Sequence, residues 1–297
     1  MYDIVIIGGG PSGLTAAIYA ARYKLRILVL AKQTGGTIAE ASYVCNFPGF
    51  KSISGFEFMQ KVEEQAKTLG TELIEEEVSE IKKKGKNFLI NGIYESRYLI
   101  LAVGTERRKL NVPGEKEFAG KGISYCFTCD APFFKDKKVG VVGGSDAAAM
   151  AALLLREYAK KVYIIYRKEK IRAEPILVEQ ILHDAKIDVI TNTIITQIKG
   201  DNVMRSVVFN DGSEFKLDGL FVEIGSNPHN KLAEKLSLAL DEEGYIVVDK
   251  FQKTSIDKIY AAGDISTNSN KFRQVITACA EGAVAAESIY TQIKKEK

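Results

Sequence analysis

The sequence is poor in histidine and in net charge, and both shortages exclude classes of function. Its two histidines, His183 and His229, have no partner at the spacing of a metal site. We therefore expect no metal, and no Ser-His-Asp arrangement suggests hydrolysis. The formal net charge of +3 over 297 residues is too small to attract nucleic acid or an anionic membrane, so neither is an expected partner.

Long hydrophobic runs are also missing. The best candidate, Ala147 to Leu155, ends at Arg156 and is far shorter than the roughly 18 apolar residues that span a bilayer. The chain begins with strand-like residues, without a basic leader. Four cysteines without a secretory signal predict a cytoplasmic protein in which any disulfide is catalytic. Two of them, Cys45 and Cys279, are expected to be small buried thiols.

The chain does contain one pattern twice, in which a strand, a glycine-rich turn, a helix and a second strand follow one another. The first copy has these elements at 2–7, 8–13, 14–23 and 26–30, and the second at 138–142, 143–146, 147–158 and 161–166. Continuous apolar strands that alternate with helices are typical of parallel sheets. We predict an α/β fold with two Rossmann-like dinucleotide-binding domains.

Two loops predict where the chain passes between these domains. The first is Val112-Pro113-Gly114-Glu115, and the second is Gly225-Ser226-Asn227-Pro228. The second domain is thus expected to be inserted into the first, with residues 1–109 and 227–297 in one domain and residues 110–226 in the other. We also expect hinges at these loops, near 111–115 and 225–228.

The first glycine-rich turn has the spacing of a dinucleotide site, with Gly8, Gly10 and Gly13 between a strand and a helix. The first glycine permits a tight turn, the second lets the backbone approach a pyrophosphate, and the third lets helix and strand pack closely. The acidic residue expected about 20 positions later is absent, because Ala31 and Lys32 end the second strand. The hydroxyl groups of the adenosine ribose must therefore hydrogen-bond to another residue.

The second turn departs from this spacing. It reads Gly143-x-Ser145-x-x-Ala148, so a serine side chain stands where a pyrophosphate would approach. The following strand ends in Tyr166-Arg167-Lys168, with Arg172 close behind. Cations at this position favour the 2′-phosphate of NADPH over NADH. The alternative interpretation is an ordinary basic helix cap or exposed loop.

The segment Cys126-Phe127-Thr128-Cys129-Asp130 places two thiols close together beside a carboxylate. Such a pair can close into a disulfide and pass on two electrons through a mixed disulfide, while the acid manages protons. Zinc binding is the alternative, but two thiols supply only half of the four ligands and nothing nearby completes the set. A dithiol in a chain with two dinucleotide signatures predicts an electron relay.

Together these features resemble the low-molecular-weight thioredoxin reductases, which are FAD-dependent pyridine nucleotide-disulfide oxidoreductases. The likeness extends from Tyr2 to about Tyr290. It rests on the segments Gly8–Gly13, Gly35-Gly36, Asn46–Phe50, Val112–Glu115, Cys126–Asp130, Ala261–Asp264 and Arg273-Gln274.

The resemblance implies a homodimer that binds FAD through residues 1–109 and 227–297, binds NADPH through residues 110–226, and reduces thioredoxin or a glutaredoxin-like protein. Cys129 would face the flavin, Cys126 would attack the partner, and Asp130 would protonate a leaving thiolate. FAD would contact Gly8, Gly10, Ser12, Gly13, Gly36, Asn46, Gly263, Asp264, Arg273 and Gln274. NADPH would contact Gly143, Ser145, Arg167, Lys168 and Arg172.

The departures from the family pattern are concentrated in the second nucleotide site. Gly143-Gly144-Ser145 replaces three glycines, and Met150-Ala151 replaces a glutamate pair. In the basic segment that ends at Arg172-Ala173, Tyr166 replaces a histidine and Lys168 an arginine. A reduced deazaflavin or ferredoxin is therefore an alternative donor, and Gly36–Ala41 resembles the deazaflavin-linked kind. The same features would also suit a flavin-dependent dithiol oxidase that uses oxygen or, outside enzymes, a nucleotide- or zinc-binding module.

Overall fold

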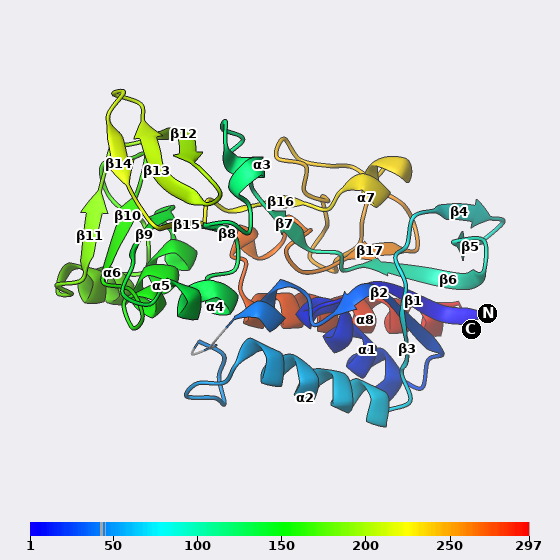
Figure 1. Cartoon of the computed structure of the whole chain (residues 1–297). Helices are drawn as coiled ribbons and strands as arrows, with labels where there is room; N and C mark the ends of the chain where they lie inside the picture. The colour runs from blue at the N-terminus through cyan, green and yellow to red at the C-terminus, as the bar shows by residue number, and fades with distance from the viewer. Residues whose placement is uncertain (42–43, 45, 297) are drawn as a thin grey trace. The chain divides into compact units, whose positions relative to one another are not determined.

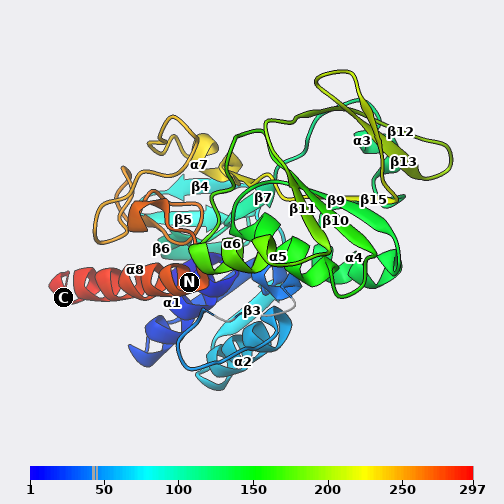
Figure 2. The same ribbon diagram turned by 90° about the vertical axis from the view of Figure 1, so that its left-hand side faces the viewer.

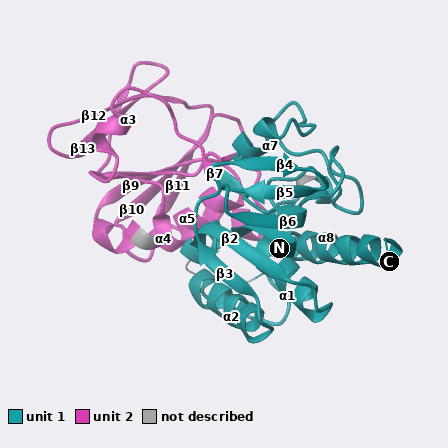
Figure 3. Cartoon of the chain, turned by 90° about the vertical axis from the view of Figure 1, so that its right-hand side faces the viewer, with its two compact units in different colours: residues 1–106, 228–297 teal, residues 107–227 magenta. Residues whose placement is uncertain are grey.

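The computed structural model describes residues 1–41, 44 and 46–296, without the side chains of Cys129 and Lys271. The prediction for Cys45 thus lies outside the described residues. The chain forms two compact units, the first from Met1–Glu106 with Pro228–Lys297 and the second from Arg107–Asn227 (Figure 3). Unit 2 is inserted into the sequence of unit 1. In the described part of the chain, no helix combines the length and the apolar surface that crossing a membrane requires.

Unit 1 is built on a seven-stranded sheet. Its order is β3 (Glu72–Glu75), β2 (Ile27–Thr34), β1 (Tyr2–Gly9), β6 (Tyr94–Leu101), β5 (Asn87–Ile90) and β4 (Ile81–Lys84), with β17 (Ile259–Ala261) also paired to β6. The strands β1, β2, β3, β6 and β17 are parallel, whereas β4 and β5 form an antiparallel extension. β6 pairs with β5 through its first half and with β17 through its last residues.

Both faces of this sheet are covered. The helices α1 (Pro11–Arg22), α2 (Gly55–Thr68) and α8 (Val275–Lys295) lie on one face, and α7 (Lys231–Lys235) lies on the other (Figure 1). Ile4 and Ile6 of β1 pack in the first layer, while Val5 and Ile7 pack in the second. Since successive strand side chains point to opposite faces, burial on both sides explains the uninterrupted apolar run at the N-terminus.

Unit 2 is built on a five-stranded parallel sheet. Its order is β11 (Ile187–Ile190), β10 (Lys161–Ile165), β9 (Lys138–Val142), β15 (Gly219–Val222) and β8 (Ile123–Ser124). One face packs against α4 (Phe127–Asp130), η2 (Ala131–Phe134), α5 (Asp146–Leu155) and α6 (Pro175–Leu182) (Figure 2). The other face packs against α3 (Glu115–Phe118) and the antiparallel strands β12 (Ile195–Gly200), β13 (Met204–Phe209) and β14 (Glu214–Lys216).

The predicted α/β fold with two Rossmann-like units, one inserted into the other, is confirmed, although two helix boundaries differ. The first helix begins at Pro11, three residues earlier than predicted, because proline is favourable in a first helical turn. The second ends at Leu155 rather than at Tyr158. Its end is set by the turn into β10, where Lys160 N donates to Lys137 O at 2.9 Å.

The two segments that connect the units pair with each other, as β7 (Thr105–Arg107) and β16 (Ser226–Pro228). Further contacts reinforce this ribbon. Arg108 N donates to Gly225 O at 2.9 Å, Arg108 Nε donates to Asn227 Oδ1 at 2.8 Å, and Arg107 forms a 2.7 Å ion pair with the buried Glu223.

The loop Val112–Glu115, near which the sequence predicts a crossing, lies inside unit 2. The buried carboxylate of Glu115 accepts hydrogen bonds from the backbone N–H groups of Leu110 and Asn111, at 2.7 and 2.6 Å. Ile198 N also donates to Pro113 O at 2.9 Å. These bonds fix the loop to its own unit.

Candidate functional site

The turn between β1 and α1 is shaped by glycines. A Cβ atom added to Gly8, whose φ is +119°, would strike the carbonyl oxygen of Ala102, and one added to Gly13 would strike that of Gly8. Of the described residues, only Gly36 comes within 4 Å of where a Cβ on Gly10 would stand, through its α-carbon at 3.9 Å. The backbone at Gly10 is therefore uncovered by side chains and opens at the N-terminus of α1, which fits a pyrophosphate.

A second close approach joins α1 to the C-terminal part of the chain. The buried Ser12 stands so near Gly263 that a Cβ there would lie 2.5 Å from Ser12 Oγ. A Cβ on Gly282 of α8 would strike the carbonyl oxygen of Ser12. Glycine at position 282 of α8 is thus required by this packing, and the contact of Ser12 with Gly263 places Gly263 and Asp264 at the first turn of α1.

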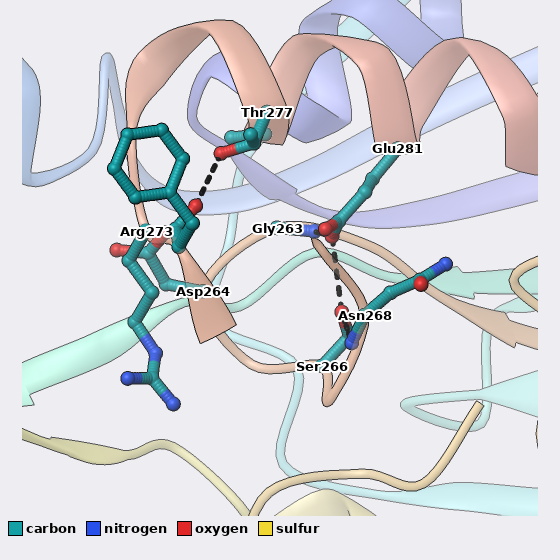
Figure 4. A pocket seen from close by; sticks show the side chains of 9 residues that line it. Gly263, Asp264, Ser266, Asn268, Arg273, Thr277 and Glu281 are labelled. Carbon is teal, nitrogen blue, oxygen red and sulfur yellow. Dashed lines mark hydrogen bonds between the residues drawn. The ribbon is translucent and has the colours of Figure 1, made fainter. Parts of the chain in front are cut away.

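A buried carboxylate that the sequence did not reveal fixes this segment. Glu281 Oε2 accepts hydrogen bonds from Gly263 N at 2.8 Å and from Ser266 Oγ at 3.0 Å (Figure 4). A signal existed in the sequence, because Glu281 lies three residues after Ala278 and four before Ala285, on the apolar face of its helix. Glu281 therefore orients the backbone that precedes Asp264.

Asp264 and Arg273 lie at the same pocket. Burial raises the pKa of the Asp264 carboxyl above its ordinary value, while the charge of Arg273 opposes this shift and that of Glu281 adds to it. The Arg273 guanidinium stacks on the Tyr245 ring at 3.9 Å from its centroid, and its buried Nε and Nη2 have no hydrogen-bond partner among the described residues. Buried N–H donors are normally hydrogen-bonded, so these two nitrogen atoms fit a site in which a cofactor rich in acceptor oxygens, such as FAD, supplies the acceptors.

A further pair connects distant parts of the same unit. Asn46 Nδ2 donates to Gln274 Oε1 at 2.9 Å. Gln274 is the N-cap of α8 and forms a capping box with Thr277. The residues proposed for FAD from the sequence all belong to unit 1, where Gly10 lies near Gly36, Ser12 lies against Gly263, Asp264 interacts with Arg273, and Asn46 is bonded to Gln274.

The corresponding turn of unit 2 is covered by an aromatic ring. Carbon atoms of the Tyr166 ring lie within 2.6 Å of where a Cβ on Gly144 would stand. Arg172 N donates to Gly144 O at 2.7 Å, so the loop after β10 folds back onto the turn. Ser145 caps α5 without a side-chain hydrogen bond, and a Cβ on Gly143 would strike the carbonyl oxygen of Glu223.

The side chains of Arg167, Lys168 and Arg172 are exposed, and none of them forms an ion pair with a described residue. They are available to an anion such as a 2′-phosphate. Met150 and Ala151 differ in burial. Met150 is partly buried, whereas Ala151 is fully buried in the core between α5 and the sheet of unit 2. A carboxylate at position 151 would therefore be buried in this chain, so only position 150 can present one.

The dithiol segment follows β8 in unit 2. Cys126 is disulfide-bonded and is the N-cap of α4. Its backbone N–H donates to Ser124 Oγ at 3.0 Å, and its carbonyl accepts from Asp130 N at 3.1 Å. Thr128 Oγ1 lies 3.3 Å from Cys126 Sγ. The segment therefore brings the Cys126 sulfur, a hydroxyl and the backbone of Asp130 into one short turn.

The remaining cysteine and histidines lie apart from these sites. Cys279 is a partly buried free thiol near Pro11, and burial raises its pKa. His183 is the C-cap of α6 and His229 follows the second crossing, and both are exposed. The described residues contain no group of three histidine, cysteine, aspartate or glutamate side chains that could hold a metal ion.

Comparison with known proteins gives a consistent result. The family model for the pyridine nucleotide-disulphide oxidoreductases matches residues 2–282. The thioredoxin reductase of Peptoclostridium acidaminophilum is 39% identical, over 96% of this chain and 95% of its own, and that of Bacillus subtilis is 38% identical, over 99% and 96%. The crystal structure of Lactococcus lactis thioredoxin reductase has a TM-score of 0.94 at 34% identity, covering 99% of this chain and 100% of that one. The T. acidophilum thioredoxin reductase structure has a TM-score of 0.92 at 38% identity, covering 99% of both chains.

Proposed function

The chain belongs to the pyridine nucleotide-disulphide oxidoreductases, as a member of the thioredoxin reductases, and on this premise we propose which of its residues carry the reaction. Its function is thioredoxin-disulfide reduction with FAD as cofactor, and NADPH is the donor of the family. A deazaflavin or ferredoxin donor, a dithiol oxidase and a nucleotide- or zinc-binding module are not favoured by these relatives.

The observation that carries the proposal is the close approach of other segments to the β1–α1 turn of unit 1, with Gly36 near Gly10 and Gly263, which precedes Asp264, against Ser12. Gly8, Gly10 and Gly13 leave the backbone open for the pyrophosphate of FAD. Asp264, Arg273 and the Asn46–Gln274 pair supply polar groups for the rest of the cofactor. When bound, FAD takes an electron pair from the nicotinamide and makes it available to a disulfide.

We propose that Cys126 and Cys129 form the redox disulfide. After its reduction, the Cys126 thiolate attacks one sulfur of the thioredoxin disulfide, and the other sulfur leaves as a thiolate. Cys129 then attacks Cys126 in the mixed disulfide, which releases reduced thioredoxin and restores the enzyme disulfide. Asp130, beside Cys129 in α4, supplies the proton that the leaving thiolate needs.

The proposed flavin residues belong to unit 1 and the dithiol to unit 2. During turnover the dithiol must therefore reach first the flavin and then the protein substrate. It cannot face a flavin and a protein substrate at once, and we propose that unit 2 moves during turnover. A hinge near 111–115 is disfavoured, because Glu115 and Ile198 hold that loop within unit 2. We place the hinges at the other end of the β7–β16 ribbon, at 104–106 and 228–229.

A homodimer in the cytoplasm, acting on thioredoxin or on a glutaredoxin-like protein, is proposed from the family likeness. NADPH is proposed to bind at Gly143, Ser145, Arg167, Lys168 and Arg172.

Anaerobic titration of the purified flavoprotein with NADPH, NADH and reduced deazaflavin, followed by addition of oxidised thioredoxin, tests the proposal. NADPH is expected to bleach the flavin, and thioredoxin is expected to restore its colour. Bleaching by a small dithiol alone would support the oxidase, and a colourless protein that contains zinc would overturn the flavoenzyme assignment.

A further inference from the structure

The hydroxyl of Thr128 lies within hydrogen-bonding distance of the sulfur on which the proposed reaction depends. Thr128 Oγ1 and Cys126 Sγ are 3.3 Å apart, and both side chains are partly buried. Because Cys126 is disulfide-bonded, its sulfur carries no proton. The hydroxyl is therefore the donor and the sulfur is the acceptor.

The surrounding backbone holds this pair in place. Ser124 Oγ accepts from Cys126 N at 3.0 Å, and Asp130 N donates to Cys126 O at 3.1 Å. The residue before the cysteine is also fixed, because Tyr125 Oη donates to the buried carboxylate of Glu115 at 2.7 Å. Threonine is restricted at χ1 by its β-branch, so little conformational freedom is lost when its hydroxyl faces the sulfur.

We propose that Thr128 is a catalytic residue whose hydroxyl stabilises the Cys126 thiolate. This inference rests on the proposed function. When an electron pair arrives at Cys129, the bond between the two sulfurs breaks and Cys126 leaves as a thiolate. The Thr128 hydroxyl donates to that charge without giving up its proton. The same bond holds the thiolate until its electron pair forms a new bond to a thioredoxin sulfur.

The hydrogen bond is expected to change the pH dependence of the attack. Hydrogen bonds to charged groups are about twice as strong as those between neutral groups, so the bond favours the thiolate over the thiol. Without it, the thiol pKa should rise by about one unit. A thiol of higher pKa is also a stronger nucleophile, by about threefold per unit. Removal of the hydroxyl should thus slow the reaction about threefold at neutral pH and accelerate it about threefold at high pH.

The test uses the full-length flavoprotein with Cys129→Ser, in which Cys126 is the one thiol left in the redox segment. The alkylation rate of Cys126 by iodoacetamide is measured by peptide mass spectrometry from pH 5 to 10, with Thr128 retained or replaced in Thr128→Val and Thr128→Ser. Thr128→Val is expected to raise the apparent pKa by about one unit, and Thr128→Ser to leave it nearly unchanged.

The alkylation of Cys279 in the same digests is the internal control and should be the same in all three proteins. If Thr128→Val loses its flavin, Thr128→Ala takes its place. Equal pKa values for Cys126 with and without the hydroxyl would overturn the proposal. The assay needs neither a donor nor thioredoxin, so failure of the proposed function would instead appear as an unmodified protein that cannot reduce thioredoxin.

Discussion

Asn46 donates a hydrogen bond to Gln274 at 2.9 Å, although 228 positions of sequence separate the two residues. The bond joins the loop before α2 to the N-cap of α8. Both residues were assigned to the flavin site from the family likeness. Each therefore orients the other before any cofactor binds.

Asn46→Ala should weaken FAD binding by about tenfold, because Gln274 loses the donor that orients its side chain. The measurement is the dissociation constant of FAD for the deflavinated protein. Asn202→Ala, in the exposed turn between β12 and β13, is the matched control and should bind FAD normally. Equal affinities of Asn46→Ala and the control would show that the pair does not contribute.

Cys126→Ser and Cys129→Ser should each abolish thioredoxin reduction while FAD binding and reduction by the donor persist. The relay needs both sulfurs, whereas the proposed flavin residues lie in unit 1. Only a thiolate left at Cys129 should give a long-wavelength charge-transfer band with oxidised flavin, so the two variants should differ in their absorption spectra. Substantial thioredoxin reduction by either variant would refute the relay.

Asp264→Asn should stabilise the protein without its cofactor. The raised pKa, caused mainly by burial, means that the folded protein binds a proton at Asp264 more readily than the unfolded chain. The carboxylate therefore costs stability as the pH rises from the ordinary aspartate pKa through the raised one, and the cost is absent below both. We expect the Tm of the deflavinated variant to rise by about 1–3 °C at neutral pH and to show no gain at pH 3.

The control for Asp264 is Asp201→Asn. Backbone N–H groups lower the pKa of this exposed aspartate, so its substitution should not raise the Tm at neutral pH. Thermal scans from pH 3 to 8 check both variants. FAD retention of Asp264→Asn should fall, and a variant that is neither more stable nor weaker in binding would contradict the assignment of Asp264.

Ser145→Gly together with Met150→Glu should improve reduction by NADPH. The serine side chain is proposed to stand where the pyrophosphate would approach, and because it forms no capping bond its removal should cost the helix little. Stopped-flow flavin reduction is expected to be slow or to saturate weakly with NADPH in the unmodified protein, and to improve several-fold in the double variant. Ser145→Ala with Met150→Glu is the control that keeps the Cβ.

Fast flavin reduction by micromolar NADPH in the unmodified protein would show that the departures at these two positions are harmless.

Arg172→Ala should reduce the affinity for NADPH by about tenfold or more and leave that for NADH unchanged. The exposed guanidinium has no ion-pair partner among the described residues and can form charge-assisted bonds with a 2′-phosphate. Binding titrations with both nucleotides provide the comparison. Lys216→Ala, an exposed cation of β14, is the control, and an equal loss for NADPH and NADH would remove the phosphate from the explanation.

The features that could be predicted from the sequence were those that depend on a residue and its neighbours in the chain. Gly8 and Gly13 were recognisable because no other residue permits their backbone conformation or close contacts. The buried carboxylates Glu115 and Glu281 were not, because their burial depends on donors elsewhere, such as Tyr125 and Gly263. For the same reason the sequence showed that 112–115 forms a turn but not that Ile198 fixes it within unit 2.

The pairing of β6 with β17 has a consequence for biosynthesis. The last residues of β6 find this neighbour only after the ribosome has made residues 259–261, and α1 acquires its packing partner, α8, later still. Unit 2 is continuous from Arg107 to Asn227 and carries its own sheet. Unit 2 can therefore complete its fold before unit 1, although residues 1–106 are synthesised first. Until β17 is made, the last residues of β6 lack this neighbour, and an unpaired strand edge in a nascent chain is a binding site for chaperones.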